Sequence, residues 1–348
     1  MKRKHFLSSL LTAGAAATLP ALGSPTRQGM PGSKVVKPVP PRIPDYLSTG
    51  DTIGITCPAG FITLKEIEPA IQQIESWGFK TKIGNTVGKR DFSFGGTDVE
   101  RAADLQQMID DPSLKAILCA RGGYGAVRIV DRLDLSGLSN YPKWVIGFSD
   151  ITVLLCHIHR NLNMAGIHSK MCNSFPDDWS KAEPVQVESI LSIRQALIGE
   201  AMQYPIVVNE KNKTGVAEGQ LVGGNLKTLE TLSGTRSDID TVGKILFVED
   251  TGEYLYSIDR MFWNLERTGK LGGLQGLIVG GFKIKPDDPG EEFGRTLYDI
   301  VLERVNAYKF PVVFDFPVGH QKNNYALKYG MSHRLSVTTD KVTLEDHI

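Results

Sequence analysis

Residues 144–155 read Trp144-Val145-Ile146-Gly147-Phe148-Ser149-Asp150-Ile151-Thr152-Val153-Leu154-Leu155. The segment begins as a short apolar run, turns at residues 147–150, and continues as an apolar pattern of helical length. A serine at such a strand-to-helix turn can be held on a tight bend, with its hydroxyl exposed beside backbone N–H groups. The α/β-hydrolase form of this turn has glycine two residues after the serine, where this chain has Ile151. On these residues alone a helix N-cap is the favoured interpretation of Ser149, and a nucleophile is the alternative.

Strands and helices are expected to alternate before this segment. The pattern predicts strands over 52–57, 81–84 and 116–120 and helices over 64–77, 98–109 and 126–133. Such alternation predicts an α/β fold with a parallel sheet and crossover helices. Ligands of these sheets bind beyond the carboxyl ends of the strands. Because Ser149 and residues 121–125 both follow strands, we expect them to face one crevice.

Residues 121–125 form a glycine-rich turn, Arg121-Gly122-Gly123-Tyr124-Gly125. Its glycines would let backbone N–H groups approach a ligand closely. No Lys-Ser or Lys-Thr pair follows, and the spacing is not Gly-x-Gly-x-x-Gly, so a phosphate cradle is disfavoured. An oxyanion or substrate loop fits better, and a purely structural tight turn remains open.

The second half of the chain has more predicted strands, most of them short. After a predicted helix over 183–198, short strands are expected at 204–208, 216–221, 245–248, 277–279, 311–314, 335–338 and 341–344, with helices at 226–232, 257–267 and 295–305. We therefore expect an N-terminal α/β domain over 46–202 and a C-terminal domain over 203–348.

The first residues are unlike the rest. Lys2, Arg3 and Lys4 precede an apolar, alanine-rich run from Phe6 to Leu22. This layout predicts a signal peptide over 1–23, with a relaxed twin-arginine character, and an uncleaved membrane anchor is the alternative. The Pro/Gly-rich segment 24–45 is expected to be a linker. We expect an exported, periplasmic protein without stable membrane insertion after signal cleavage.

Composition favours a soluble globular protein. Of 348 residues, 41% are hydrophobic and 22% are charged, which is enough for a sizeable core. Lys+Arg and Asp+Glu both number 39, so nothing indicates a nucleic-acid partner. The four cysteines, Cys57, Cys119, Cys156 and Cys172, have no metal-site spacing. We expect buried free thiols, no metal and no cofactor.

Two features of the second half could assist a nucleophile. Glu249 and Asp250 follow the predicted strand over 244–248, and either could orient a histidine. His320 lies on a loop beside Gly319, a suitable position for a general base, although a lone loop histidine is usually a surface residue. His157 and His159, two residues apart on a predicted helix, do not share a face and are poor co-ligands.

Five short motifs occur in order along the chain, at residues 121–125, 146–150, 223–226, 247–250 and 319–320. With these motifs, the chain resembles the LD-carboxypeptidase (muramoyltetrapeptide carboxypeptidase) family, with its microcin-resistance relatives, over about residues 50–344. The resemblance implies a serine peptidase in which Ser149 is the nucleophile, Glu249 the orienting acid and His320 the base. It also implies an N-terminal domain like class I glutamine amidotransferases, a smaller β-rich α+β C-terminal domain, and a homodimer.

The expected activity is therefore release of the terminal D-Ala from murein tetrapeptides through an acyl-enzyme. The backbone N–H of Asp150 and one from Gly122 or Gly123 would hold the oxyanion. Arg121 is the candidate for the substrate carboxylate, and a salt bridge that supports its loop is the alternative. Two other functions stay open: a microcin-resistance type amide hydrolase acting on peptidyl-nucleotides, and a non-catalytic peptidoglycan-binding protein. The chain departs from the family in its export signal and at residues 166–171, where relatives carry a Gly-Pro-Met-like sequence.

Overall fold

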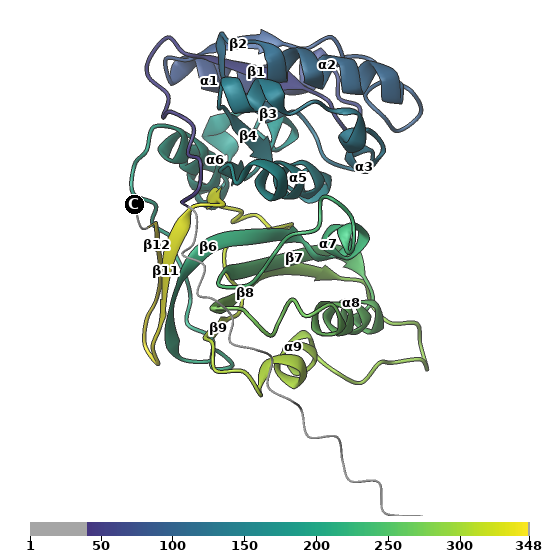
Figure 1. Ribbon diagram of the computed structural model, residues 1–348, viewed down its shortest axis with the longest axis vertical. Helices are drawn as coiled ribbons and strands as arrows, with labels where there is room; N and C mark the ends of the chain where they lie inside the picture. Colours follow the sequence, from purple (N-terminus) through teal and green to yellow (C-terminus); the bar gives the residue numbers. More distant parts are fainter. Residues whose placement is uncertain (1–39, 347–348) are drawn as a thin grey trace, which may run out of the picture. The chain divides into compact units, whose positions relative to one another are not determined.

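Two six-stranded sheets organise residues 40–346, the part of the chain that the computed structural model describes (Figure 1). The predicted signal peptide and the predicted linker as far as residue 39 lie outside the described residues. From residue 40 the chain runs along the first sheet, where Arg42 bridges to Met164 and the indole of Trp144 donates to the Asp45 carbonyl at 3.0 Å. Between residues 40 and 346, no helix is long and apolar enough to cross a membrane.

The first sheet has the strand order β10-β5-β4-β3-β1-β2. Its strands are β1 (Thr52–Thr56), β2 (Lys80–Ile83), β3 (Leu114–Cys119), β4 (Trp144–Gly147), β5 (Gly166–His168) and β10 (Leu327–Tyr329). Strands β1 to β5 are parallel, and β10 pairs antiparallel with β5. The helices of this half are α1 (Leu64–Ser76), α2 (Asp98–Asp110), α3 (Ala126–Ile129), α4 (Ser136–Asn140), α5 (Thr152–Leu162) and α6 (Pro184–Leu197). The predicted parallel sheet with crossover helices is confirmed.

Local signals explain where the crossover helices begin. Thr63 and Thr97 each accept a hydrogen bond from the backbone three residues on, while Glu66 and Glu100 reach back to the threonine N–H groups. Such reciprocal capping satisfies backbone donors that a helix start leaves free. The starts of α1 and α2 are therefore encoded within a few residues.

The second sheet has the order β12-β11-β6-β7-β8-β9. Its strands are β6 (Gly215–Asn225), β7 (Ile245–Glu253), β8 (Gly276–Ile284), β9 (Val312–Val313), β11 (Ser332–Val337) and β12 (Val342–Asp346), with helices α7 (Leu226–Leu232), α8 (Leu255–Arg267) and α9 (Leu297–Val305). Strands β6 to β9 are parallel, whereas β11 and β12 add antiparallel pairs. Short 3-10 turns occur at Val130–Arg132, Ser149–Ile151, Cys172–Ser174 and Trp179–Lys181.

Two strand predictions need correction. Residues 204–208 form no strand, although Tyr204, Ile206 and Val208 are half-buried and the residues between them are exposed. Their alternating burial matches the expected pattern, but no strand within residues 40–346 pairs with them. Conversely, β10 was not expected, because three residues are too few to show a period.

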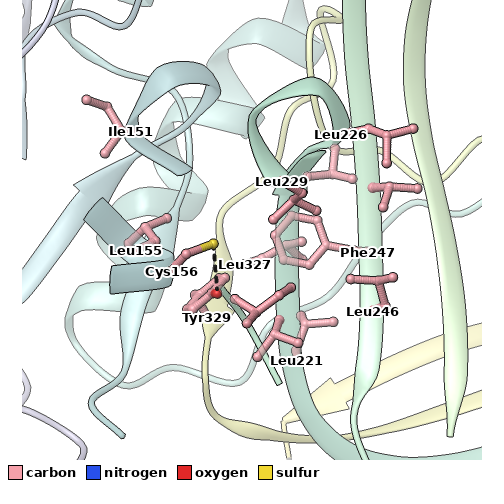
Figure 2. Close-up of a cluster of buried hydrophobic side chains, with 14 of the residues drawn as sticks. Ile151, Leu155, Cys156, Leu221, Leu226, Leu229, Leu246, Phe247, Leu327 and Tyr329 are labelled. Carbon is pink, nitrogen blue, oxygen red and sulfur yellow. Dashed lines mark hydrogen bonds between the residues drawn. The ribbon is translucent and has the colours of Figure 1, made fainter. Parts of the chain in front are cut away.

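The two sheets are joined by one hydrophobic core. Helix α5 contacts β5 of the first sheet as well as β6 and α7 of the second. Figure 2 shows Cys156 of this helix pointing to Tyr329 of β10, with Phe247 and Leu221 of the second sheet on the other side of Tyr329. The Tyr329 hydroxyl donates to the Cys156 thiol at 3.6 Å. Since burying each large apolar side chain contributes about 1.5–3 kcal/mol, this cluster holds the sheets together.

All four cysteines are buried and unpaired, as predicted.

Candidate active site

Ser149 occupies a strained position at the carboxyl end of β4. Its φ is +61°, in the left-handed region that costs a non-glycine residue about 1–2 kcal/mol. The side chain caps no helix, because the cap positions of the 3-10 turn and of α5 are Phe148 and Ile151. The N-cap interpretation of Ser149 is therefore wrong, and its hydroxyl is free to serve another partner.

That partner is His320, in the loop between β9 and β10. The Ser149 hydroxyl donates to His320 Nε2 at 3.1 Å, and His320 Nδ1 donates to Glu249 Oε2 at 2.6 Å. Glu249 lies on β7 and is fully buried, whereas the His320 side chain is 17% exposed. The three residues named from the sequence thus form one hydrogen-bonded chain, which begins on the first sheet and ends on the second.

Packing around His320 fixes its position. Gly319 has a φ of +104°, and a Cβ built on it would lie 2.5 Å from the Glu249 Cβ. Its N–H donates to the Asn324 side chain at 2.9 Å. The ring of Phe148 lies 5.0 Å from the imidazole of His320, between ring centroids. Only glycine fits this turn, and the turn brings the histidine against the buried carboxylate.

The other histidines within residues 40–346 are buried. Burial lowers the pKa of His168 to about 3 and those of His159 and His333 to about 4, and it also lowers the pKa of His157. Such neutral, enclosed rings cannot exchange protons with a substrate near pH 7. His320 is thus the candidate base. In the same range no three His, Cys, Asp or Glu side chains are grouped as metal ligands.

Backbone donors surround the Ser149 side chain. A Cβ built on Gly122 would lie 3.2 Å from the Ser149 Cβ, so this turn passes directly beside the serine. The N–H groups of Gly123 and Asp150 have no protein acceptor among the described residues. They border the same cavity as Ser149. The structure therefore places Gly122, Gly123 and Asp150 together, in positions compatible with the predicted oxyanion site.

The side chain of Asp150 has a supporting position. Its Oδ2 accepts the Ala126 N–H at 2.8 Å, which ties the Ser149 turn to the start of α3. Burial raises the pKa of this carboxyl to about 6. Burial therefore disfavours the ionised carboxylate, and its hydrogen bonds offset only part of that cost.

A cavity of about 350 Å³ opens at Ser149. It is lined by Gly123, Tyr124, Val127, Ser149, Asp150, Val153, Asn225, Lys227, Thr228, Thr231, Asp250, Thr251 and Glu253. A larger hollow of about 580 Å³ beside α6 is not lined by Ser149. The smaller cavity is thus the candidate substrate site.

Asn225 has no role predicted from the sequence, although it lies in the motif at residues 223–226. Its N–H donates to Thr152 Oγ1 at 3.1 Å, and its side-chain amide donates to Asp250 Oδ1 at 3.0 Å. Asp250 also accepts the Lys227 N–H at 2.9 Å, and burial raises its pKa to about 6. Asn225 therefore links the helix after Ser149 to the strand that carries Glu249. The Gly-Gly before it was the available signal, because both glycines adopt positive φ.

Arg121 points away from this cavity. Its Nη1 donates to the Phe61 carbonyl at 3.0 Å, and its guanidinium lies 5.5 Å from the centroid of the Phe61 ring. It forms no ion pair with any residue from 40 to 346. The structure thus shows the Arg121 guanidinium held by Phe61, without the alternative salt bridge within residues 40–346.

Both halves of the chain are similar to LD-carboxypeptidase domains. Residues 53–169 match the model of the LD-carboxypeptidase N-terminal domain, and residues 218–335 match that of the LD-carboxypeptidase C-terminal domain. The probable murein peptide carboxypeptidase of Bacillus subtilis (strain 168) is 32% identical over 87% of this chain and 94% of its own. The crystal structure of muramoyltetrapeptide carboxypeptidase from Oxalobacter formigenes has a TM-score of 0.75 and 26% identity, covering 85% of this chain and 99% of that one. The microcin C7 self-immunity protein MccF of Escherichia coli is 24% identical over 86% of this chain and 94% of its own.

Proposed function

Because the chain belongs to the LD-carboxypeptidase family, we propose that it is a serine-type LD-carboxypeptidase that removes the terminal D-alanine from murein tetrapeptides. The observation that carries this proposal is the Ser149–His320–Glu249 chain of hydrogen bonds beside a cavity. Nucleophile, base and orienting acid in this geometry are the parts that acyl transfer to serine requires.

In the proposed reaction His320 Nε2 takes the proton of the Ser149 hydroxyl as Oγ attacks the carbonyl carbon before the D-residue. Glu249 accepts from Nδ1, so the neutral imidazole has its free lone pair on Nε2. His320 then gives the proton to the leaving amine, and water releases the acyl group by the same steps in reverse roles. The first proton transfer joins atoms already within hydrogen-bond reach, since Ser149 Oγ lies 3.1 Å from His320 Nε2.

The oxyanion would be held by the N–H groups of Asp150 and Gly123. Both are free of protein acceptors, so they can donate to a developing charge without breaking a bond. Losing one such donor typically costs about 3–4 kcal/mol of transition-state stabilisation. The positive φ of Ser149 supports this arrangement, because a sharp strand-to-helix turn of this kind exposes a serine hydroxyl beside backbone N–H groups.

The test is Ser149→Ala with a murein tetrapeptide that ends in D-alanine. We expect kcat to fall by about 10⁶-fold, as when the serine of a comparable triad is removed. The control is Ser136→Ala, an exposed serine that does not line the cavity, which should keep wild-type kcat. Wild-type release of D-alanine by Ser149→Ala would refute the mechanism.

The same enzyme separates the other candidate functions. An amide hydrolase of the microcin-resistance type would cleave a peptidyl-nucleotide faster than the tetrapeptide. A non-catalytic peptidoglycan-binding protein would bind the tetrapeptide while Ser149 never reacts with a fluorophosphonate. We expect labelling at Ser149 and a preference for the tetrapeptide.

Export and a homodimer complete the proposal. A basic start followed by an apolar run supports export to the periplasm. Cell fractionation of the full chain tests the location, and analytical ultracentrifugation tests the dimer.

A further inference from the structure

Lys170 differs from the other buried lysines of residues 40–346. Three of the four have close partners: Lys143 donates to the carbonyls of Met108, Ile109 and Asp111; Lys270 contacts Asp238 and the Ile239 carbonyl; and Lys328 contacts Asp346 and the Glu200 carbonyl. Lys170 is only 8% exposed, yet its ammonium has a single long contact, 3.4 Å to the Gln321 carbonyl. An ammonium group has three donors, so this one is largely unsatisfied.

No negative charge compensates Lys170. Neither Lys170 nor its neighbour Lys283 forms an ion pair with a described residue. Burial, together with the positive charge of Lys283, lowers the pKa of Lys170 to about 8. A buried charge without a counter-charge destabilises the protein, and an anionic ligand would offset that cost.

The backbone around Lys170 runs beside the catalytic groups. Ser169 N–H donates to the Gly147 carbonyl at 3.3 Å, which places this segment against the turn before Ser149. A Cβ built on Gly122 would lie 3.2 Å from the Met171 methyl group and equally far from the Ser149 Cβ. On the other side, Gln321 directly follows His320.

This position matches the geometry of the leaving group. In the proposed reaction His320 protonates the nitrogen of the terminal amino acid. The α-carboxylate carbon of that residue lies two bonds from this nitrogen, at about 2.5 Å. A group that binds the carboxylate must therefore lie near His320, and the Lys170 ammonium contacts the residue next to it.

We propose that Lys170 binds the free α-carboxylate of the substrate's terminal amino acid. The site rests on the proposed function and takes a role that Arg121, directed toward Phe61, does not fill. An ammonium–carboxylate contact is a charge-assisted hydrogen bond, which is lost when the carboxylate is replaced by an amide. Lys170 would thus make the enzyme a carboxypeptidase rather than an endopeptidase.

The test compares two tetrapeptides, one ending in free D-alanine and one in D-alaninamide. For Lys170→Met we expect kcat/KM on the free acid to fall about 10- to 100-fold, mainly through KM. On the amide kcat/KM should stay within about threefold of wild type, so the preference for the acid collapses. Lys170→Arg should restore much of the preference for the acid.

Arg121→Met is the matched control and should keep the acid preference. If Lys170→Met lowers kcat/KM equally on both substrates, Lys170 only supports the Gln321 loop and the proposal is wrong. An unchanged preference for the free acid over the amide would also overturn the proposal. If Lys170→Met does not fold, Lys170→Gln retains a donor to the Gln321 carbonyl and is measured instead. A wild-type enzyme that cleaves neither substrate would refute the proposed function itself, which separates the two failures.

Discussion

Replacing Glu249 with glutamine tests the link between the two sheets at its shortest contact. In the native protein His320 Nδ1 donates to Glu249 Oε2 at 2.6 Å, which leaves Nε2 free to accept from Ser149. A glutamine of the same shape can present its amide N–H to Nδ1. That contact would move the imidazole proton to Nε2, the wrong nitrogen for a base.

The expected loss can be worked out from this tautomer change. In a serine-protease triad the corresponding acid-to-amide change lowers kcat by about 10⁴. At 1.36 kcal/mol for each factor of ten, this corresponds to about 5 kcal/mol of transition-state stabilisation. Glu249 is fully buried and its Oε1 has no partner within residues 40–346. Removing its charge should therefore leave the thermal stability unchanged or raise it.

The assay is steady-state release of D-alanine from the tetrapeptide, with Tm measured on the same sample. We expect kcat of Glu249→Gln to be about 10⁴-fold below wild type, with Tm at or above that of wild type. A folded variant with kcat within tenfold of wild type would refute the role of Glu249. A matched substitution is Glu253→Gln on the same strand, which lines the cavity but does not touch His320; it should keep kcat within about tenfold.

Two further predictions concern backbone and charge. Gly319→Ala should lower kcat at least about tenfold, because its Cβ would lie 2.5 Å from the Glu249 Cβ. Gly234→Ala is the control: it is also at positive φ but in open space, so it should cost only about 1 kcal/mol of stability and no activity. Equal kcat values for the two variants would contradict this prediction. The pKa of Asp150 is raised to about 6 from 3.8. The folded protein therefore binds this proton more tightly than the unfolded chain, and the resulting stabilisation is fully present below pH 3.8 and is lost as the pH rises through 6. Asp150→Asn should therefore gain about 3 kcal/mol of unfolding free energy relative to wild type between pH 4 and pH 8 in urea titrations, and a pH-independent difference would contradict it.

Most of the fold could be predicted from local pattern. The starts of α1 and α2 follow from Thr63 and Thr97 with a glutamate three residues on, and the buried strands of the first sheet read as short apolar runs. Residues 204–208 failed because a strand needs a neighbour, and alternating burial occurs without one. The pairing of β10 with β5 joins segments about 160 residues apart, a contact that no short window contains.

For the site, the sequence by itself determined which residue types were present and in which order. Ser149, Glu249 and His320 were named from five motifs, yet the local pattern around Ser149 favoured a helix cap. That preference failed because the φ of +61° is set by the packing of its turn and cannot be read from neighbouring residues.

Only the tertiary structure decided what these residues touch. It joined a serine on one sheet to a carboxylate on the other through His320, and it turned Arg121 toward Phe61. It also left the Lys170 ammonium buried with one long contact. Burial and counter-charge are properties of groups brought together from distant parts of the chain, so they arise only when the two sheets pack.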